Sequence, residues 1–271
     1  MDLVSVGVQG IEAVCAEQGA GDPLLLVHGW GAAASHWRRV WGRLVPRYRC
    51  LAPDLPGWGL SEKPDVPYTM EWYADWIADL LEMRGASPAM VVGHSMGATI
   101  ALALALRHPG RVTRLALLNP IVRGSDGLKP ETRLLTKPVI RTLAFPFTRT
   151  RWFLRFIARN FTEGPALEEG DLLLIARGTY ASMTRTLESL KTIDLMPGLE
   201  SIRCPTLVIG TDADREVPPA QCDLAARIPG ARRETIEKCG HVPILEQPDR
   251  TASILIDFLG PGAQRARPPQ W

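Results

Sequence analysis

Short runs of apolar residues recur along this chain, and segments with helical periodicity separate most of them. Four of these runs, at residues 24–27, 89–92, 115–118 and 207–209, are apolar at every position. Strands of a parallel sheet have this composition when helices cover both faces, because water then reaches neither face. The pattern predicts the α/β class, with a mostly parallel central sheet between two layers of helices.

The segment from Thr69 to Gly85 has the clearest helical pattern. Thr69 is a suitable N-cap and Gly85 a suitable C-terminal stop. One face of the helix collects the large apolar side chains Trp72, Trp76, Ile77, Leu80 and Leu81. Further helices are expected after residue 96 and near residues 220–227 and 249–258.

The alternation of strands and helices is interrupted once, and the interruption sets the predicted domain boundaries. Residues 121–199 contain no strand-like run in their long central part, and we expect them to form a helical lid inserted into the fold. The α/β core then consists of residues 1–120 and 200–260. Residues 261–271 are rich in Gly and Pro and predict a disordered tail.

Composition and net charge give little indication of a binding partner. The chain has 271 residues, enough for a large core, and its net charge of +2 gives no reason to expect a nucleic-acid partner. No segment has the features of a signal peptide or the length of about 20 apolar residues that crosses a bilayer. The cysteines are scattered and read as reduced thiols, which predicts a cytoplasmic protein: Cys15, Cys50, Cys204, Cys222 and Cys239.

The sequence VVGHSMG places Ser95 between Gly93 and Gly97, directly after an apolar run and before a helical segment. A serine at such a strand-to-helix turn has strained backbone angles, and neighbours with a Cβ would clash. This is the G-x-S-x-G nucleophile elbow. The Met96 N–H lies at the start of the following helix, where the helix dipole favours negative charge, so we expect it to stabilise an oxyanion.

A serine hydroxyl needs a base, and His241 is the best candidate. It lies in the loop sequence KCGHVPILEQP after the last predicted strand, where a loop can carry the imidazole to the sheet edge near Ser95. His28 and His94 are closer to the elbow but lie in turns. His36 and His108 fall in helical contexts and read as surface or packing residues.

The histidine in turn needs a carboxylate to fix its tautomer. The loop sequence TDADREVPP follows a buried strand and offers Asp212, Asp214 and Glu216. We favour Asp214 from its spacing to the following Val-Pro pair, and Asp212 remains the alternative. Asn119, after the preceding strand, cannot supply this charge.

The second oxyanion donor is expected from the loop HGWGAAASHW, where the Trp30 N–H would point inward and its indole could pack on the substrate. We expect further substrate contacts from five residues, of which two lie in the predicted lid: Gly29, His94, Phe145, Trp152 and Val242.

Five segments together resemble the α/β-hydrolase superfamily, in its branch of lid-bearing serine esterases, lipases and carbon–carbon bond hydrolases: LLLVHGWG, APDLPGWGLSEKP, VVGHSMG, VIGTDADREVPP and CGHVPILEQPDRTASILIDFL. The resemblance covers about residues 3–125 and 200–260. It implies an α/β-hydrolase fold with Ser95 as nucleophile, His241 as base and Asp214 as acid. Serine at the elbow disfavours haloalkane dehalogenase and epoxide hydrolase chemistry, which needs an aspartate there.

The predicted lid is basic and aromatic. Residues 121–160 contain nine basic residues against Asp126 and Glu131: Arg123, Lys129, Arg133, Lys137, Arg141, Arg149, Arg151, Arg155 and Arg159. Two interpretations are open. The aromatic residues can cover the pocket while the arginines stay in water, or an amphipathic helix can make peripheral contact with an anionic membrane.

The sequence therefore predicts a serine hydrolase that cleaves carboxylic esters of hydrophobic small-molecule substrates, with no cofactor and no metal. Cleavage of a carbon–carbon bond in a vinylogous diketone, thioester hydrolysis and perhydrolysis would use the same triad and remain alternatives. A ligand-binding receptor on a hydrolase scaffold is the alternative from another class.

Overall fold

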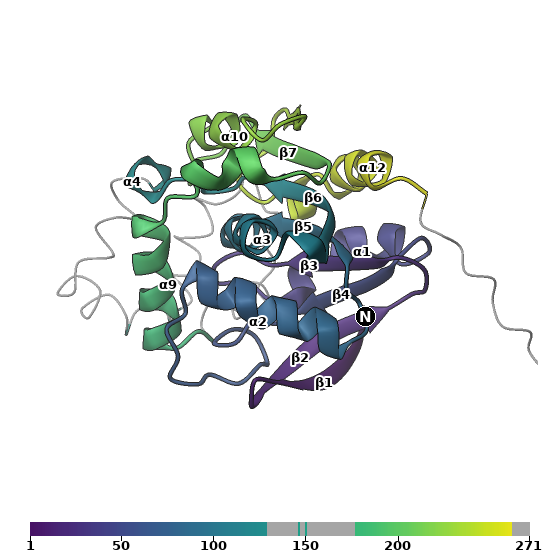
Figure 1. The fold of residues 1–271 in the computed structure, drawn as a ribbon, viewed down its shortest axis with the longest axis vertical. Coiled ribbons are helices and arrows are strands. Elements are labelled where there is room, and N and C mark those ends of the chain that lie inside the picture. The colour runs from purple at the N-terminus through teal and green to yellow at the C-terminus, as the bar shows by residue number, and fades with distance from the viewer. Residues whose placement is uncertain (129–145, 147–149, 151–176, 262–271) are drawn as a thin grey trace, which may run out of the picture.

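A computed structural model of the chain describes residues 1–128, 146, 150 and 177–261. Within these residues eight strands form a single sheet (Figure 1). The strands are β1 (Asp2–Val8), β2 (Ile11–Gln18), β3 (Pro23–Val27), β4 (Arg49–Pro53), β5 (Ala89–His94), β6 (Val112–Leu118), β7 (Thr206–Thr211) and β8 (Arg232–Ile236).

The order of strands across the sheet is β1-β2-β4-β3-β5-β6-β7-β8. The pairs β1–β2 and β2–β4 are antiparallel, and every later pair is parallel. The parallel strands β3, β5, β6 and β7 therefore end at the same edge of the sheet. The predicted fold class, a mostly parallel sheet in an α/β fold, is confirmed.

Helices cover both faces of the sheet (Figure 1). The α-helices of six residues or more are α1 (Arg38–Leu44), α2 (Met70–Met83), α3 (Met96–Arg107), α9 (Tyr180–Thr192), α10 (Ala220–Ala225) and α12 (Pro248–Leu259). The remaining elements are the 3-10 helices η1 (Ala34–Trp37), η2 (Pro109–Arg111) and η4 (Met196–Ser201) and the one-turn helices α4 (Gly124–Gly127) and α11 (Pro243–Glu246). One apolar cluster joins α2, α3 and α10 to the sheet, and a second joins α1, α11 and α12 to its other face.

The local signals for α2 are those expected from sequence. The Thr69 hydroxyl accepts a hydrogen bond from the Trp72 N–H, which satisfies one of the N–H groups left open at the helix start. The apolar face includes Trp76, Ile77 and Leu80, all fully buried. The predicted cap and apolar face are both confirmed.

Residues 34–44 form η1 and α1, where the sequence pattern predicted no bounded helix beyond a helical context for His36. The signal was present, because Trp37, Val40, Trp41 and Leu44 have helical spacing and all four are buried. This segment connects β3 to β4 and covers the face of the sheet opposite α2 and α3.

The two ends of the predicted lid segment are joined where they leave the core. The Gly124 N–H donates to the Ile193 carbonyl over 2.8 Å, and the Leu195 N–H donates to the Val122 carbonyl over 3.0 Å. Phe145, Trp152 and most of the basic residues of the segment lie outside the described residues. Among the described helices, none has the length and apolar character needed to cross a membrane.

Candidate active site

Ser95 lies at a sharp turn between β5 and α3. Its backbone has φ 53° and ψ −120°, a region that residues with a Cβ rarely occupy. A Cβ on Gly93 would lie 2.2 Å from the Gly97 carbonyl oxygen, and one on Gly97 would lie 2.2 Å from the Val27 oxygen. Glycine is needed on both sides of the serine, because the turn leaves no room for a Cβ between the neighbouring backbone segments.

The structure brings Ser95, His241 and Asp214 together from three loops. Ser95 Oγ lies 2.9 Å from His241 Nε2, and His241 Nδ1 lies 2.8 Å from Asp214 Oδ2. A carboxylate only accepts hydrogen bonds, so Nδ1 carries the proton and Nε2 is left to accept from the serine hydroxyl. The chain thus holds the tautomer that a general base for Ser95 requires.

The two aspartates of the loop after β7 are placed differently. Asp214 has a side chain that is 2% exposed, and its Oδ1 accepts from the N–H groups of Glu216 and Val217. Asp212 is exposed, and its Oδ1 accepts from the Cys239 N–H. Of the two carboxylates, only Asp214 contacts the imidazole.

Burial and charge act in opposite directions on this pair. Burial lowers the pKa of His241, but the negative charges of Asp214, Glu216 and Glu246 outweigh it, and the pKa is raised from its ordinary value. Burial raises the pKa of Asp214, but His241 and the two backbone N–H donors lower it by more than burial raises it. The net shift of this pKa is downward. Both shifts favour an imidazolium beside a carboxylate.

The loop after β3 is held by His28. Its Nε2 accepts from the Leu55 N–H over 3.0 Å, so its Nδ1 carries the proton and donates to the Gly29 carbonyl over 2.8 Å. Burial lowers the pKa of His28. The Ala32 N–H also donates to the Gly29 carbonyl. In a trans peptide the N–H of Trp30 then points away from the His28 ring.

Gly29 packs directly against the elbow. A Cβ on Gly29 would lie 3.3 Å from Ser95 Cβ and 3.2 Å from His94 Nδ1. Within the described part of the chain, the backbone N–H groups of Trp30 and Met96 have no hydrogen-bond acceptor. One of these N–H groups follows Gly29, which packs on the elbow, and the other follows Ser95 at the start of α3; an oxyanion site needs two such donors.

The remaining predicted contact residues are placed as follows. The Trp30 indole is partly buried, meets the Trp58 ring edge-on at 5.6 Å and donates to the Met183 carbonyl. His94 is buried and its Nε2 donates to the His241 carbonyl over 2.7 Å. Val242 is buried in the apolar cluster of α11 and α12.

Two other groups that hold the site were missed by sequence reasoning. Asn119, set aside there because it carries no charge, donates through Nδ2 to the His241 carbonyl over 3.0 Å. Asp54 is buried and accepts from the Ala34 and Leu60 N–H groups, each over 2.7 Å, which fixes the loops after β3 and β4. A carboxylate placed directly after a buried strand was the available signal for Asp54.

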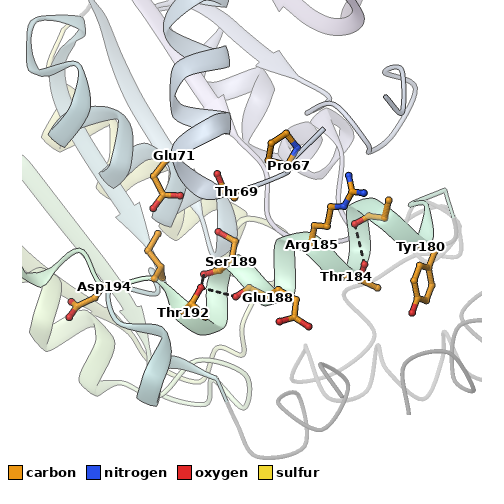
Figure 2. A pocket seen from close by; sticks show the side chains of 12 residues that line it. Pro67, Thr69, Glu71, Tyr180, Thr184, Arg185, Glu188, Ser189, Thr192 and Asp194 are labelled. Carbon is orange, nitrogen blue, oxygen red and sulfur yellow. Dashed lines mark hydrogen bonds between the residues drawn. The ribbon is translucent and has the colours of Figure 1, made fainter. Parts of the chain in front are cut away.

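A cavity of about 690 Å³ lies between the start of α2 and the length of α9 (Figure 2). Its lining includes Glu71, Glu188 and Asp194, with Arg185, whose guanidinium pairs with Asp65. Ser95, His241 and Asp214 do not line it. It is therefore separate from the candidate reaction centre.

Comparison with known proteins agrees with this geometry. The family model described as the alpha/beta hydrolase family matches residues 24–254. A 2-hydroxymuconate semialdehyde hydrolase of Pseudomonas sp. (strain CF600) is 31% identical over 92% of this chain and 91% of the relative. A pimeloyl-(acyl-carrier protein) methyl ester esterase of Neisseria meningitidis serogroup A is 29% identical over 86% of this chain and 75% of the relative.

Among solved structures, a thermophilic esterase from Thermogutta terrifontis superposes with a TM-score of 0.81 at 26% identity, over 96% of this chain and 98% of the other. Family match, relatives and fold agree over nearly the whole length. The chain belongs to the α/β-hydrolase family and is a serine hydrolase.

Proposed function

We propose that this hydrolase cleaves carboxylic esters of hydrophobic small molecules through an acyl-enzyme on Ser95. The observation that carries the proposal is the continuous chain of hydrogen bonds from Ser95 Oγ through His241 to Asp214. The N–H groups of Trp30, in the loop after β3, and of Met96, directly after the serine, have no acceptor within the described residues, which supports their role as the oxyanion site.

The proposed reaction has two halves. Ser95 Oγ attacks the ester carbonyl while His241 Nε2 takes the hydroxyl proton, and the Trp30 and Met96 N–H groups hold the negative oxygen. The C–O bond then breaks and the imidazolium returns its proton to the departing alcohol. Water, deprotonated by His241, attacks the acyl-enzyme and releases the acid, which restores Ser95.

We base the preference for apolar substrates on the aromatic residues of the lid segment and on the partly buried indole of Trp30 in the loop after β3. Trp30 and Trp58 form an edge-to-face pair next to the candidate oxyanion loop. Gly29 and His94 lie against Ser95 and remain proposed substrate contacts, together with Phe145 and Trp152 of the lid segment and Val242. The lid itself is proposed as residues 121–199, and the paired stems at residues 122–124 and 193–195 support that boundary.

Turnover of p-nitrophenyl esters of increasing acyl length tests the proposal. Wild-type protein should hydrolyse them, and Ser95→Ala should lose at least about 10³-fold in kcat. A fluorophosphonate probe should label wild-type protein and leave Ser95→Ala unlabelled. Unchanged turnover in Ser95→Ala would reject the role of this serine. Stoichiometric ligand binding without turnover would instead support the receptor alternative.

Carbon–carbon bond hydrolysis is the second candidate, and the 31% identical Pseudomonas relative favours it. The same triad would act on a vinylogous diketone. Comparing kcat/KM for such a diketone with that for p-nitrophenyl esters separates the two reactions. A diketone turned over with a kcat/KM above that of the best ester would replace ester hydrolysis as the proposed function.

Peripheral membrane contact through the basic and aromatic lid segment stays a proposal from sequence. Flotation with vesicles containing anionic lipid, at low salt, tests it. Recovery of the protein with anionic but not with neutral vesicles would support it, and no recovery with either would reject it.

A further inference from the structure

The loop that carries His241 is held by side chains on both sides of the histidine. Glu246, at the end of α11, accepts from the Gly240 N–H through Oε2 and from the Val242 N–H through Oε1, each over 2.9 Å. One carboxylate therefore binds the two amide groups that flank His241. Hydrogen bonds from N–H groups to a carboxylate are charge-assisted and stronger than neutral ones.

The carbonyl of His241 is held from the opposite direction. His94 Nε2 donates to it over 2.7 Å, and Asn119 Nδ2 donates over 3.0 Å. His94 directly precedes Ser95, and Asn119 directly follows β6. The peptide groups around His241 are thus tied to the elbow, to the sheet and to α11, and this network determines where the imidazole stands relative to Ser95 Oγ.

We propose that Glu246 is a positioning residue for the reaction, which fixes the backbone on both sides of His241 and supplies a further negative charge facing its imidazole. The inference rests on the proposed function, because it needs His241 to act as the base. It differs from a plain structural role, in which Glu246 would only satisfy N–H groups at the start of α11.

The charged and titratable groups that face His241 come from several elements. Asp214 and Glu216 lie in the loop after β7, Glu246 lies in α11, and His94 lies at the end of β5. His94 stays neutral at working pH, because burial and the neighbouring His241 lower its pKa to about 3. The three carboxylates each raise the pKa of His241.

Glu246→Gln is the test, because it keeps the shape and removes the charge. An amide oxygen can accept from one of the two loop N–H groups, but the amide NH₂ then faces the other as donor against donor. We expect kcat to fall about 10- to 100-fold with KM changed by less than about threefold, since a displaced base impairs the chemical step more than binding.

The pH profile distinguishes positioning from plain structural support. Ester hydrolysis requires neutral His241, so activity rises as pH passes the pKa of that imidazole. Removing the charge of Glu246 lowers this pKa, so the acid limb of kcat/KM should move to lower pH in Glu246→Gln. A reduced rate with an unmoved limb would assign Glu246 a purely structural role and overturn the proposal, as would a wild-type rate.

Glu237→Gln provides the control. Glu237 lies in the same loop, is exposed, and changes the net charge equally on substitution. It should leave both kcat and the acid limb unchanged. If Glu246→Gln does not fold, hydrogen exchange of wild-type protein decides: slow exchange at the Gly240 and Val242 amides supports the two hydrogen bonds, and exchange at the rate of an open loop rejects them.

The outcomes also separate this inference from the proposed function. If Ser95→Ala retains activity, the proposed function itself fails. If Ser95→Ala is inactive while Glu246→Gln keeps wild-type kcat and an unmoved pH limb, only the role of Glu246 is rejected.

Discussion

The imidazole of His28 donates a hydrogen bond to the carbonyl of Gly29, the next residue in the chain, over 2.8 Å. His28 Nε2 accepts a hydrogen bond from the Leu55 N–H. The proton of the imidazole is therefore on Nδ1, where it can be donated to the Gly29 carbonyl. Carbonyl and N–H of one trans peptide point in opposite directions, so the bond that holds the Gly29 oxygen also orients the Trp30 N–H. A side chain outside the triad thereby sets the direction of a proposed oxyanion donor.

Replacing His28 by Gln or by Asn should separate its two hydrogen bonds. The longer Gln side chain can place its amide oxygen where Nε2 stands, as an acceptor for the Leu55 N–H. It then leaves no donor where Nδ1 stands, next to the Gly29 carbonyl. The shorter Asn side chain can place its NH₂ where Nδ1 stands, as a donor to the Gly29 carbonyl, and leaves no acceptor within reach of the Leu55 N–H. We expect His28→Gln to lower kcat by about 10- to 100-fold, because losing one oxyanion donor outright costs about 10²–10³. His28→Asn should retain more activity.

His28→Asn leaves the buried Leu55 N–H without an acceptor, so it should lose about 1–3 kcal/mol of unfolding free energy. His28→Gln should lose less, because the Gly29 carbonyl keeps the Ala32 N–H as a donor. Urea denaturation and kcat for a p-nitrophenyl ester, measured on the same preparations, check this. Equal kcat in the two variants, with both folded under the assay conditions, would show that the orientation of the Gly29 peptide does not depend on His28.

Asp214 and Asp212 offer a matched pair for testing the acid. Asp214→Asn removes the acceptor that holds the Nδ1 proton of His241 and permits the wrong tautomer, so kcat should fall by about 10³–10⁴. Asp212→Asn changes the same charge at an exposed position without contact to the imidazole, and it should stay within about threefold of wild type in kcat. Steady-state kinetics at one pH are sufficient, and the reverse ranking would move the acid to Asp212.

The sequence predicted the parts of this fold whose signals are local. The covered strands, the Thr69 cap and the crowding of Ser95 by Gly93 and Gly97 follow from apolar patterning, helix capping and backbone sterics. The helix α1 was missed although its spacing was readable. The choice between Asp212 and Asp214 depended on a loop conformation, and three-dimensional contact places only Asp214 beside His241.

The sequence could not predict the hydrogen bonds that join the loops around the site. Nothing near Asn119 indicates that its amide reaches the His241 carbonyl, since the two are brought together only when β6 and the histidine loop meet at one edge of the sheet. The same holds for Glu246, whose two acceptor bonds depend on how tightly the chain turns between residues 240 and 246. Such bonds satisfy backbone groups that have no partner in a helix or strand.

The buried histidines should make the fold sensitive to acid. Burial is the main cause that lowers the pKa of His36 to about 3 from its ordinary value of 6.5, and interactions with His94, His28 and Arg38 lower it further. Between these two pH values the unfolded chain binds a proton that the folded chain excludes, so the unfolding free energy falls as pH decreases. It is unaffected by His36 above the unfolded value.

Across that window His36 should contribute a slope of about 1 kcal/mol per pH unit. His36→Gln removes this titration, so its unfolding free energy should depend less steeply on pH by about that amount, whatever the substitution does to stability at neutral pH. Urea denaturation at several pH values between about 6 and 4 measures both slopes. Equal slopes in wild type and variant would mean that His36 takes up its proton in the folded state as readily as in the unfolded chain.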